Sequence, residues 1–339
     1  MNRARRSLYE GYIAAIGRTP LTELRSPQKS FDGLVLAKEE YRNPTGSHYD
    51  REYFRLLYEL EDNRTIVPGE TPLIETTTGN AGASFAWACR ILGYSPVKVI
   101  IPADMPSARE AQIASFGAEI VHSPAGQYVK GIIATLKREL NADPKLWCPN
   151  HAADTNYSIE GMTELGKELI DDLARGGIQR IDYYVSALGN GSSLRGVGTL
   201  LRNQLGTRLI GVEPLECPTN FVACYPGRFE KEYRRPPTHS PHALIGTGAW
   251  DYEADERVEF EFPNTQYMLS QLDDIELVTD SEWRAAWQEL QDEYYQFVGS
   301  TSAACFVVAK RLLQREPGAH VLLMFYDPIW KYLDWGNRI

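Results

Sequence analysis

Short apolar runs alternate with helical patterns along most of this chain of 339 residues, and turns containing glycine join them. The run at 97–101 is of the kind that is buried in parallel sheets, and a helical pattern at 106–116 leads to the next strand-like run at 117–121. Short links in such a strand–helix–strand order imply right-handed parallel crossovers. The alternation therefore predicts an α/β fold with open, mostly parallel sheets.

A turn at residues 43–51 (NPTGSHYDR) lies between a strand-like run at 34–38 and a helical pattern at 53–60. Its proline and glycine predict the turn itself. We expect Ser47 or Asp50 to cap the helix, because a short oxygen-bearing side chain accepts the free amide hydrogens of the first turn.

Two more turns that contain glycine stand between a strand and a helix, at 78–82 and 188–196. This arrangement aims several backbone amides at one anion, so each turn predicts an anion-binding loop. An ordinary structural turn is the alternative for both. For the second turn a dinucleotide site is a further alternative, because Gly189 and Gly191 follow a strand and Glu213 comes about twenty residues later. The third glycine of that fingerprint is misplaced, which weakens the dinucleotide interpretation.

The segment 43–51 resembles the active-site segment of the cysteine synthase family, the fold type II enzymes that use pyridoxal phosphate (PLP). The family's motif reads Asn-Pro-(Ser/Thr/Gly)-x-Ser-x-Lys-Asp-Arg, and five residues match it: Asn43, Pro44, Ser47, Asp50 and Arg51. Further motifs similar to those of the family follow in the same order, so the resemblance covers roughly residues 8–335. It implies the tryptophan synthase β-like architecture of two open, mostly parallel-sheet α/β domains.

The resemblance also implies where the domains divide. Residues 45–153 are expected to form a smaller N-terminal α/β domain that carries the loop for the substrate carboxylate. Residues 1–44 together with 154–339 are expected to form a larger α/β domain that carries the loop for the cofactor phosphate. The resemblance to this class also implies that the protein is a homodimer.

Residues at matching positions inherit expected roles from the family. Those expected to bind the substrate are Thr77, Thr78, Gly79, Ala81 and Gly246. Those expected to bind PLP are Asn80, Gly189, Asn190, Gly191, Ser192, Ser193 and Thr301, or Ser300 if the alignment slips by one residue.

Tyr49 stands where the family has the lysine that holds PLP as an imine. A phenol cannot form an imine, so four interpretations stay open. PLP binds noncovalently or as a preformed imine, and Tyr49 or His48 moves the proton, since histidine titrates near neutrality. Alternatively, another of the ten lysines reaches the ring; Lys38 is the nearest in sequence, although a structural role suits it better. The remaining interpretations are chemistry without PLP on another anionic metabolite and a non-catalytic binding or regulatory protein.

Composition limits the partners of the chain. The net charge of −10 argues against a nucleic acid or an anionic membrane as a general partner. Five cysteines without a Cys-x-x-Cys pair indicate reduced thiols in a cytoplasmic protein, with neither a disulfide framework nor a metal site. No apolar run approaches the ~18 residues of a membrane span.

We therefore predict a cytoplasmic homodimer with cysteine synthase-like amino-acid metabolism. The expected reaction is β-elimination or β-replacement on an O-activated serine or a related amino acid, in a specialised biosynthetic pathway. PLP is the expected cofactor, held without the usual lysine imine, and Tyr49 and His48 are the expected catalytic residues. The alternatives are a PLP-independent relative that acts on or binds another anionic metabolite, and a pseudoenzyme.

Overall fold

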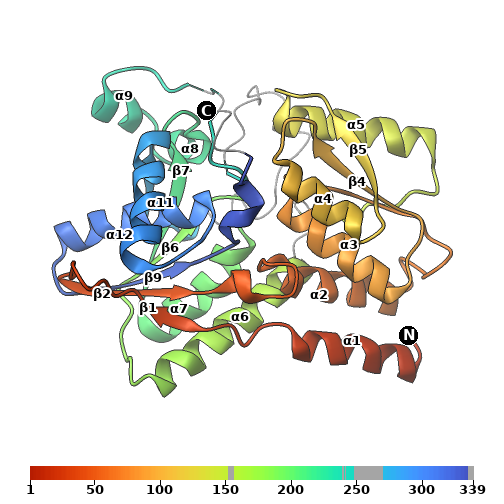
Figure 1. The fold of residues 1–339 in the computed structure, drawn as a ribbon, viewed down its shortest axis with the longest axis horizontal. Helices are drawn as coiled ribbons and strands as arrows, with labels where there is room; N and C mark the ends of the chain where they lie inside the picture. Colours follow the sequence, from red (N-terminus) through yellow and green to blue (C-terminus); the bar gives the residue numbers. More distant parts are fainter. Residues whose placement is uncertain (152–155, 239, 241, 248–269, 335–339) are drawn as a thin grey trace.

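The computed structural model describes residues 1–151, 156–238, 240, 242–247 and 270–334, which form two β-sheets flanked by helices (Figure 1). The larger sheet has six strands in the order β1 (Leu21–Glu23), β2 (Gly33–Lys38), β9 (Ala319–Met324), β6 (Tyr183–Ala187), β7 (Arg208–Pro214) and β8 (Asp274–Val278). The smaller sheet has three strands in the order β3 (Leu73–Thr76), β4 (Val97–Pro102) and β5 (Glu119–Ser123).

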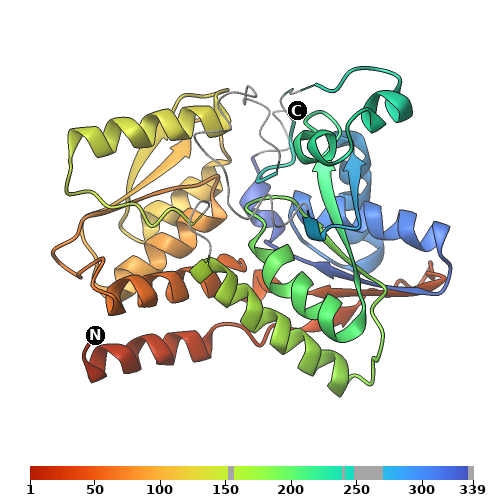
Figure 2. The same cartoon turned by 180° about the vertical axis from the view of Figure 1, so that it is seen from behind.

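The larger sheet is parallel except at its edge, where β1 pairs with β2 in the antiparallel sense. Helices lie on both of its faces, with α11 (Asp280–Tyr294) and α12 (Ser300–Arg315) on one and α6 (Asn156–Arg175) and α7 (Thr199–Leu205) on the other (Figures 1 and 2). Coverage on both faces explains why strands such as β9 are almost continuously apolar and buried.

The strands of the smaller sheet are all parallel, and the side chains on its two faces belong to two separate cores. Three helices pack against it: α3 (Asn80–Leu92), α4 (Ser107–Ser115) and α5 (Tyr128–Ala142). Leu73, Val99 and Ile101 belong to the core shared with α3 and α4, whereas Ile74 and Ile100 belong to a separate core with α5. Successive side chains of a strand point to opposite faces, and this alternation produces the two cores.

Helix α2 (Tyr49–Asp62) crosses α6 between the two sheets, and the crossing is close. A Cβ atom on Gly161 of α6 would lie 2.6 Å from the carbonyl oxygen of Arg51 in α2, so only glycine allows this approach. Helix α1 (Arg3–Ala15) packs along α2, where the hydroxyl of Tyr9 donates to the carboxylate of Glu61 at 2.8 Å. The short helices are η1 (Glu40–Arg42), η2 (Leu194–Gly198), α8 (Thr219–Cys224), α9 (Arg228–Tyr233) and η4 (Ile329–Tyr332).

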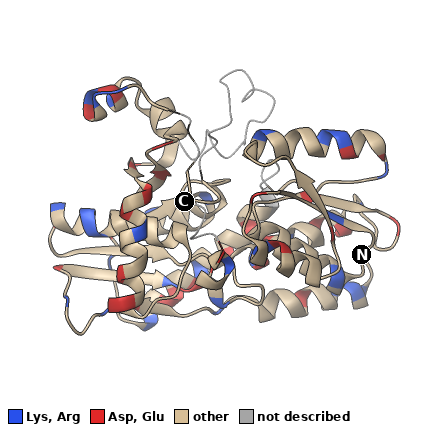
Figure 3. Ribbon diagram, turned by 45° about the horizontal axis from the view of Figure 1, so that its top comes forward, with Lys and Arg blue, Asp and Glu red and all other residues tan. Residues whose placement is uncertain are grey.

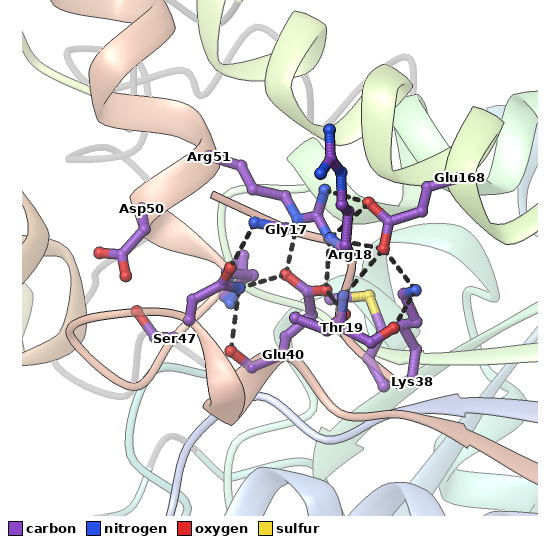
Figure 4. A network of polar contacts seen from close by, with 12 residues as sticks. Gly17, Arg18, Thr19, Lys38, Glu40, Ser47, Asp50, Arg51 and Glu168 are labelled. Atoms are coloured by element: carbon purple, nitrogen blue, oxygen red, sulfur yellow. Dashed lines mark hydrogen bonds and ion pairs between the residues drawn. The ribbon is translucent and has the colours of Figure 1, made fainter. Parts of the chain in front are cut away.

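A buried ionic network ties α2 to the larger sheet and to α6 (Figure 4). The guanidinium of Arg51 makes two hydrogen bonds with the Glu40 carboxylate, at 2.8 and 2.9 Å, and two with Glu168 of α6, at 2.9 and 3.2 Å. The ammonium of Lys38 in β2 donates to Glu168 and to Asp172, both at 2.6 Å. Each charge has an opposite partner, which is the condition for burying such groups.

The predicted α/β fold with two mostly parallel sheets is confirmed, and the proposed division into domains at residues 44/45 and 153/154 stays a prediction. The predicted cap of α2 is wrong. His48 is the N-cap and makes no side-chain capping bond, while Asp50 accepts hydrogen bonds from the Thr45 amide at 2.8 Å and the Ser84 hydroxyl at 2.6 Å. Asp50 therefore fastens the preceding turn to α3.

Acidic and basic residues are interspersed along most helices of the molecule (Figure 3). Within the part of the chain that the structure describes, every helix is too short or too polar to cross a membrane.

Candidate active site

A cavity lies between the two sheets, at the carboxyl ends of parallel strands from both. The loop after β3 and the start of α3 form one wall, and the loop after β6 forms the facing wall. The start of α2 contributes His48 and Tyr49, and Thr301 comes from the start of α12. Crevices outside the carboxyl ends of strands are where open α/β sheets bind ligands.

The structure brings most of the predicted site residues together around this cavity. The lining includes His48, Tyr49, Thr77, Thr78, Asn80, Ala81, Gly189, Asn190, Gly191, Ser192, Ser193, Gly246 and Thr301. Gly79 and Ser300 are the two that do not line it. A Cβ atom on Gly79 would lie 2.3 Å from Cδ of Arg109, so Gly79 makes room for that arginine. Ser300 is fully buried at the first position of α12.

The loop at 189–193 is held in shape by its own side chains. The Asn190 side-chain oxygen accepts hydrogen bonds from the Ser192 amide at 3.1 Å and the Ser192 hydroxyl at 2.9 Å. The hydroxyl of Ser193 bonds to that of Tyr184 on β6. Gly191 has a φ of 81°, and a Cβ atom on Gly189 would lie 3.0 Å from the Gly246 carbonyl oxygen. Backbone and small side chains thus form a narrow wall that larger residues would close.

Glu52 is a fully buried acid beneath this loop. The hydroxyl of Ser192 donates to Oε1 of Glu52 at 2.7 Å, and Nε2 of His48 lies 3.8 Å from the same oxygen. Burial raises the pKa of Glu52 to about 7, although the hydrogen bond from Ser192 opposes the rise. Glu52 can therefore carry a proton near neutral pH.

The two predicted catalytic residues are neutral in this environment. Burial lowers the pKa of His48 to about 4, and burial raises the pKa of Tyr49 well above its usual value. Their rings are in contact, with centroids 4.2 Å apart. The expectation that His48 titrates near neutrality is wrong because the cavity floor desolvates the imidazole. A catalytic role for either residue stays a prediction.

His151 is a cavity residue that the sequence analysis missed. Its Nδ1 lies 3.5 Å from Oε2 of the buried Glu75, and its ring meets the Tyr49 ring edge-on with centroids 5.4 Å apart. Burial alone would lower the pKa of His151, but the Glu75 carboxylate outweighs burial and raises it. His151 lies after α5, in a segment that contains no recognisable motif, so no local sequence signal identifies it.

Arg109 was missed for a different reason. It occupies α4, where an arginine ordinarily lies on the solvent face, yet only 2% of its surface is exposed. Its guanidinium donates to the Thr78 carbonyl at 2.9 Å and to Asp327 at 3.1 Å, and it lines the cavity. The burial results from contact with a segment more than two hundred residues away, which the sequence of α4 does not indicate.

Asn80, the first residue of α3, is held on both sides of its amide group. Its Nδ2 donates to Asp327 Oδ2 at 2.8 Å, and its Oδ1 accepts from Lys331 Nζ at 2.9 Å. The hydroxyl of Tyr332 donates to the same Asp327 oxygen at 2.8 Å. Residues after β9 thus fix the orientation of a side chain in the cavity wall.

Comparisons with known proteins identify the family in which this geometry occurs. The pyridoxal-phosphate dependent enzyme family matches residues 13–327. Cysteine synthase B of Campylobacter jejuni is 30% identical over 327 residues, which are 96% of this chain and 97% of that protein. The chain belongs to the family of pyridoxal-phosphate dependent enzymes. This finding confirms the resemblance to cysteine synthases.

Two further similarities add to this assignment. Cysteine synthase 3 of Caenorhabditis elegans is 31% identical over 235 residues, which are 69% of this chain and 64% of that protein, so the chain covers less than two thirds of the nematode protein. The crystal structure of the O-acetylserine dependent cystathionine beta-synthase from Helicobacter pylori has a TM-score of 0.77 and 24% identity, and the match covers 95% and 96% of the two chains. The similarity to the Helicobacter pylori structure supports the fold of this chain.

The family implies PLP, and the residues around the cavity fit that group in part. The narrow glycine–serine loop at 189–193 offers neutral hydrogen-bonding groups to a phosphate, and Glu52 beneath it can be protonated. Asn80, Thr301 and the Thr77–Thr78 pair offer polar contacts to a ring and a carboxylate. Among the described residues that line the cavity there is no lysine. The part of the chain that the structure describes contains no cluster suited to a metal ion.

Proposed function

We propose that this protein binds PLP in the cavity between its sheets and uses it for β-elimination or β-replacement on an O-activated serine or a related amino acid. The observation that carries the proposal is the convergence of the loops after β3 and β6 on one cavity at the carboxyl ends of the strands. Family membership and the two cysteine synthases above support the choice of cofactor and reaction.

The proposed roles follow the position of each residue in the cavity. The loop at 189–193 holds the phosphate, with Ser192 and Ser193 as its hydroxyl groups. Thr77, Thr78 and Ala81 at the start of α3 receive the substrate carboxylate. Bound PLP supplies an electron sink for the amino-acid carbanion. His48 and Tyr49 exclude water from the cavity floor, since both are uncharged and packed together.

The reaction is tested by measuring acetate release from O-acetyl-L-serine by protein that has been freed of PLP and then supplied with it. We expect release that depends on added PLP, and cysteine formation when sulfide is present. Thr78→Val removes a hydroxyl from the wall and should raise KM more than it lowers kcat, whereas Thr65→Val, outside the cavity, should change neither. Release that is equal with and without PLP would contradict the proposal.

A PLP-independent function is the second candidate, and the chain offers one observation in its favour. Tyr49 supplies no amine, and the described lining residues include no lysine that could replace it. In that case the two loops would bind another anionic metabolite. Protein that fails to bind PLP but binds a phosphorylated amino acid would support this candidate.

The homodimer, the cytoplasmic location and the specialised pathway belong to our proposal as expectations.

A further inference from the structure

The structure distinguishes the ten lysines of the chain by their surroundings, and all ten lie within the described residues. Eight have exposed or half-buried side chains: Lys29, Lys98, Lys130, Lys137, Lys145, Lys167, Lys231 and Lys310. The other two, Lys38 and Lys331, are fully buried. A buried amine is the kind that proteins use for covalent chemistry with carbonyl groups, because burial favours its neutral form.

Lys38 is held by two acidic partners. Its ammonium lies 2.6 Å from each of two carboxylates, on Glu168 and Asp172, and donates to the Thr19 carbonyl at 2.6 Å. Figure 4 shows the contacts of Lys38 with Glu168 and Thr19 inside the ionic network of α2 and α6. Two carboxylates and a backbone carbonyl hold the Lys38 side chain in place, so Lys38 has a structural role.

Lys331 has different neighbours. Its Nζ donates to the neutral Oδ1 of Asn80 at 2.9 Å, and no carboxylate of the described residues lies within the 4.0 Å of an ion pair. Burial lowers the pKa of Lys331 to about 8; the more distant Asp327 and Asp50 carboxylates oppose the change, and the Arg109 guanidinium adds to it. A substantial neutral fraction of this amine therefore exists in mildly alkaline solution.

The position of Lys331 brings its amine close to the cavity. Asn80, its hydrogen-bond partner, is part of the cavity wall. Its Cε lies 3.5 Å from the point that a Cβ atom on Gly46 would occupy, in the turn that leads directly to Tyr49. Lys331 itself does not line the cavity, and Asn80 lies between its Nζ and a ligand there, so the amine must leave this hydrogen bond and change its side-chain rotamer to reach the ligand.

We propose that Lys331 is the amine that attaches an aldehyde-bearing ligand covalently in this cavity, in the place of the amine that position 49 lacks. The inference rests on the proposed function, which supplies the aldehyde in PLP. The neutral amine adds to the aldehyde carbon, a carbon–nitrogen bond forms, and the carbonyl oxygen leaves as water with the two amine hydrogens. Asn80 receives the ammonium in the resting state and releases it when the amine reacts.

The test is reductive trapping of the full-length chain. Protein incubated with PLP is treated with sodium borohydride, which adds hydride to the carbon of the new bond and leaves a stable secondary amine. Intact mass then counts the adducts, and a peptide map locates them. We expect one adduct per chain, on the peptide that contains Lys331, with a yield that increases as the pH rises through about 8.

Lys331→Arg is the informative variant because it keeps a cationic hydrogen-bond donor for Asn80 but forms no such bond. It should lose the adduct at least tenfold, and any PLP that it still retains on ultrafiltration is then held noncovalently. Lys98→Arg, a half-buried lysine away from the cavity, is the matched control and should keep the adduct.

The outcomes separate the two proposals. An adduct on another lysine, or no adduct in protein that retains PLP on ultrafiltration, overturns the role of Lys331 and leaves the proposed function standing. Wild-type protein that retains no PLP overturns the proposed function, and the role of Lys331 is then rejected with it.

Discussion

Glu52 is a buried acid with one hydrogen bond to Ser192 and a pKa raised to about 7 from the ordinary 4.5. Between these two values the unfolded chain loses the proton and the folded chain keeps it. The free energy of unfolding therefore falls as pH rises through this window, by up to about 1.4 kcal/mol per pH unit. Relative to Glu52→Gln, wild-type protein should lose stability from pH 4.5 to 7.

Urea denaturation at several pH values measures this difference. Glu10→Gln, which changes an exposed glutamate of α1, is the control and should give a curve parallel to that of wild type. Parallel curves for wild type and Glu52→Gln would mean that Glu52 is ionised in the folded protein at neutral pH.

Tyr49 offers a second test at the level of a single residue. If the cavity accepts PLP as proposed, the double variant with Tyr49→Lys and Lys331→Arg should recover an adduct in borohydride trapping, now mapped to position 49. The physical reason is that Tyr49 lines the cavity, so an amine there meets the ligand directly. Failure of this variant to form an adduct, while it still binds PLP, would place the ligand aldehyde away from α2.

Local sequence patterns predicted the residues of the two cavity loops but not the charged residues around them. Glycines between a strand and a helix indicate the loops at 78–82 and 189–193 in the sequence. Arg109 and His151 carry no such local signal, because their contacts in the site are with distant segments. Glu52 lies near His48 in α2, but its hydrogen bond to Ser192 joins residues 140 positions apart. Tertiary packing, which one sequence does not display, brings them to the cavity.

At the level of secondary-structure elements, the ionic network of α2 makes a measurable prediction. Arg51→Met leaves the buried Glu40 carboxylate without its guanidinium, and removing one partner of such a pair costs about 3–5 kcal/mol. We expect this loss in the free energy of unfolding from urea titration. Arg25→Met breaks an exposed pair with Glu23 and should cost less than about 1 kcal/mol. Equal effects of the two substitutions would show that burial does not determine the strength of the network.

Element boundaries show where sequence patterns succeed and where they fail. The helical pattern at 53–60 lies within α2, which begins earlier, at Tyr49, and ends later, at Asp62. The strand-like run at 117–121 overlaps β5, which begins at Glu119 and ends at Ser123. Apolar periodicity locates the middle of a helix well, whereas its ends depend on contacts made elsewhere in the chain.

For the molecule as a whole, the crossing of α2 and α6 sets how closely the helices between the two sheets approach. Replacement of a helical glycine by alanine ordinarily stabilises a protein by up to about 1 kcal/mol. Gly161→Ala should have the opposite effect and cost about 1–3 kcal/mol, since its Cβ would lie 2.6 Å from the Arg51 carbonyl oxygen. Gly11→Ala in α1 has open space around its Cβ and should be neutral or stabilising. Thermal unfolding of both variants measures the difference, and a stabilising Gly161→Ala would contradict the close crossing.

The most direct test of the account is the number of PLP molecules that the chain retains in equilibrium dialysis, compared between wild type and Gly189→Val. A side chain at position 189 would press against the Gly246 carbonyl oxygen and close the loop proposed to hold the phosphate. We predict one PLP per chain for wild type and at least a tenfold loss of affinity for the variant, with circular dichroism showing that both are folded. Wild-type protein that retains no PLP, or a variant that retains as much as wild type, would contradict the claim that this cavity is the cofactor site.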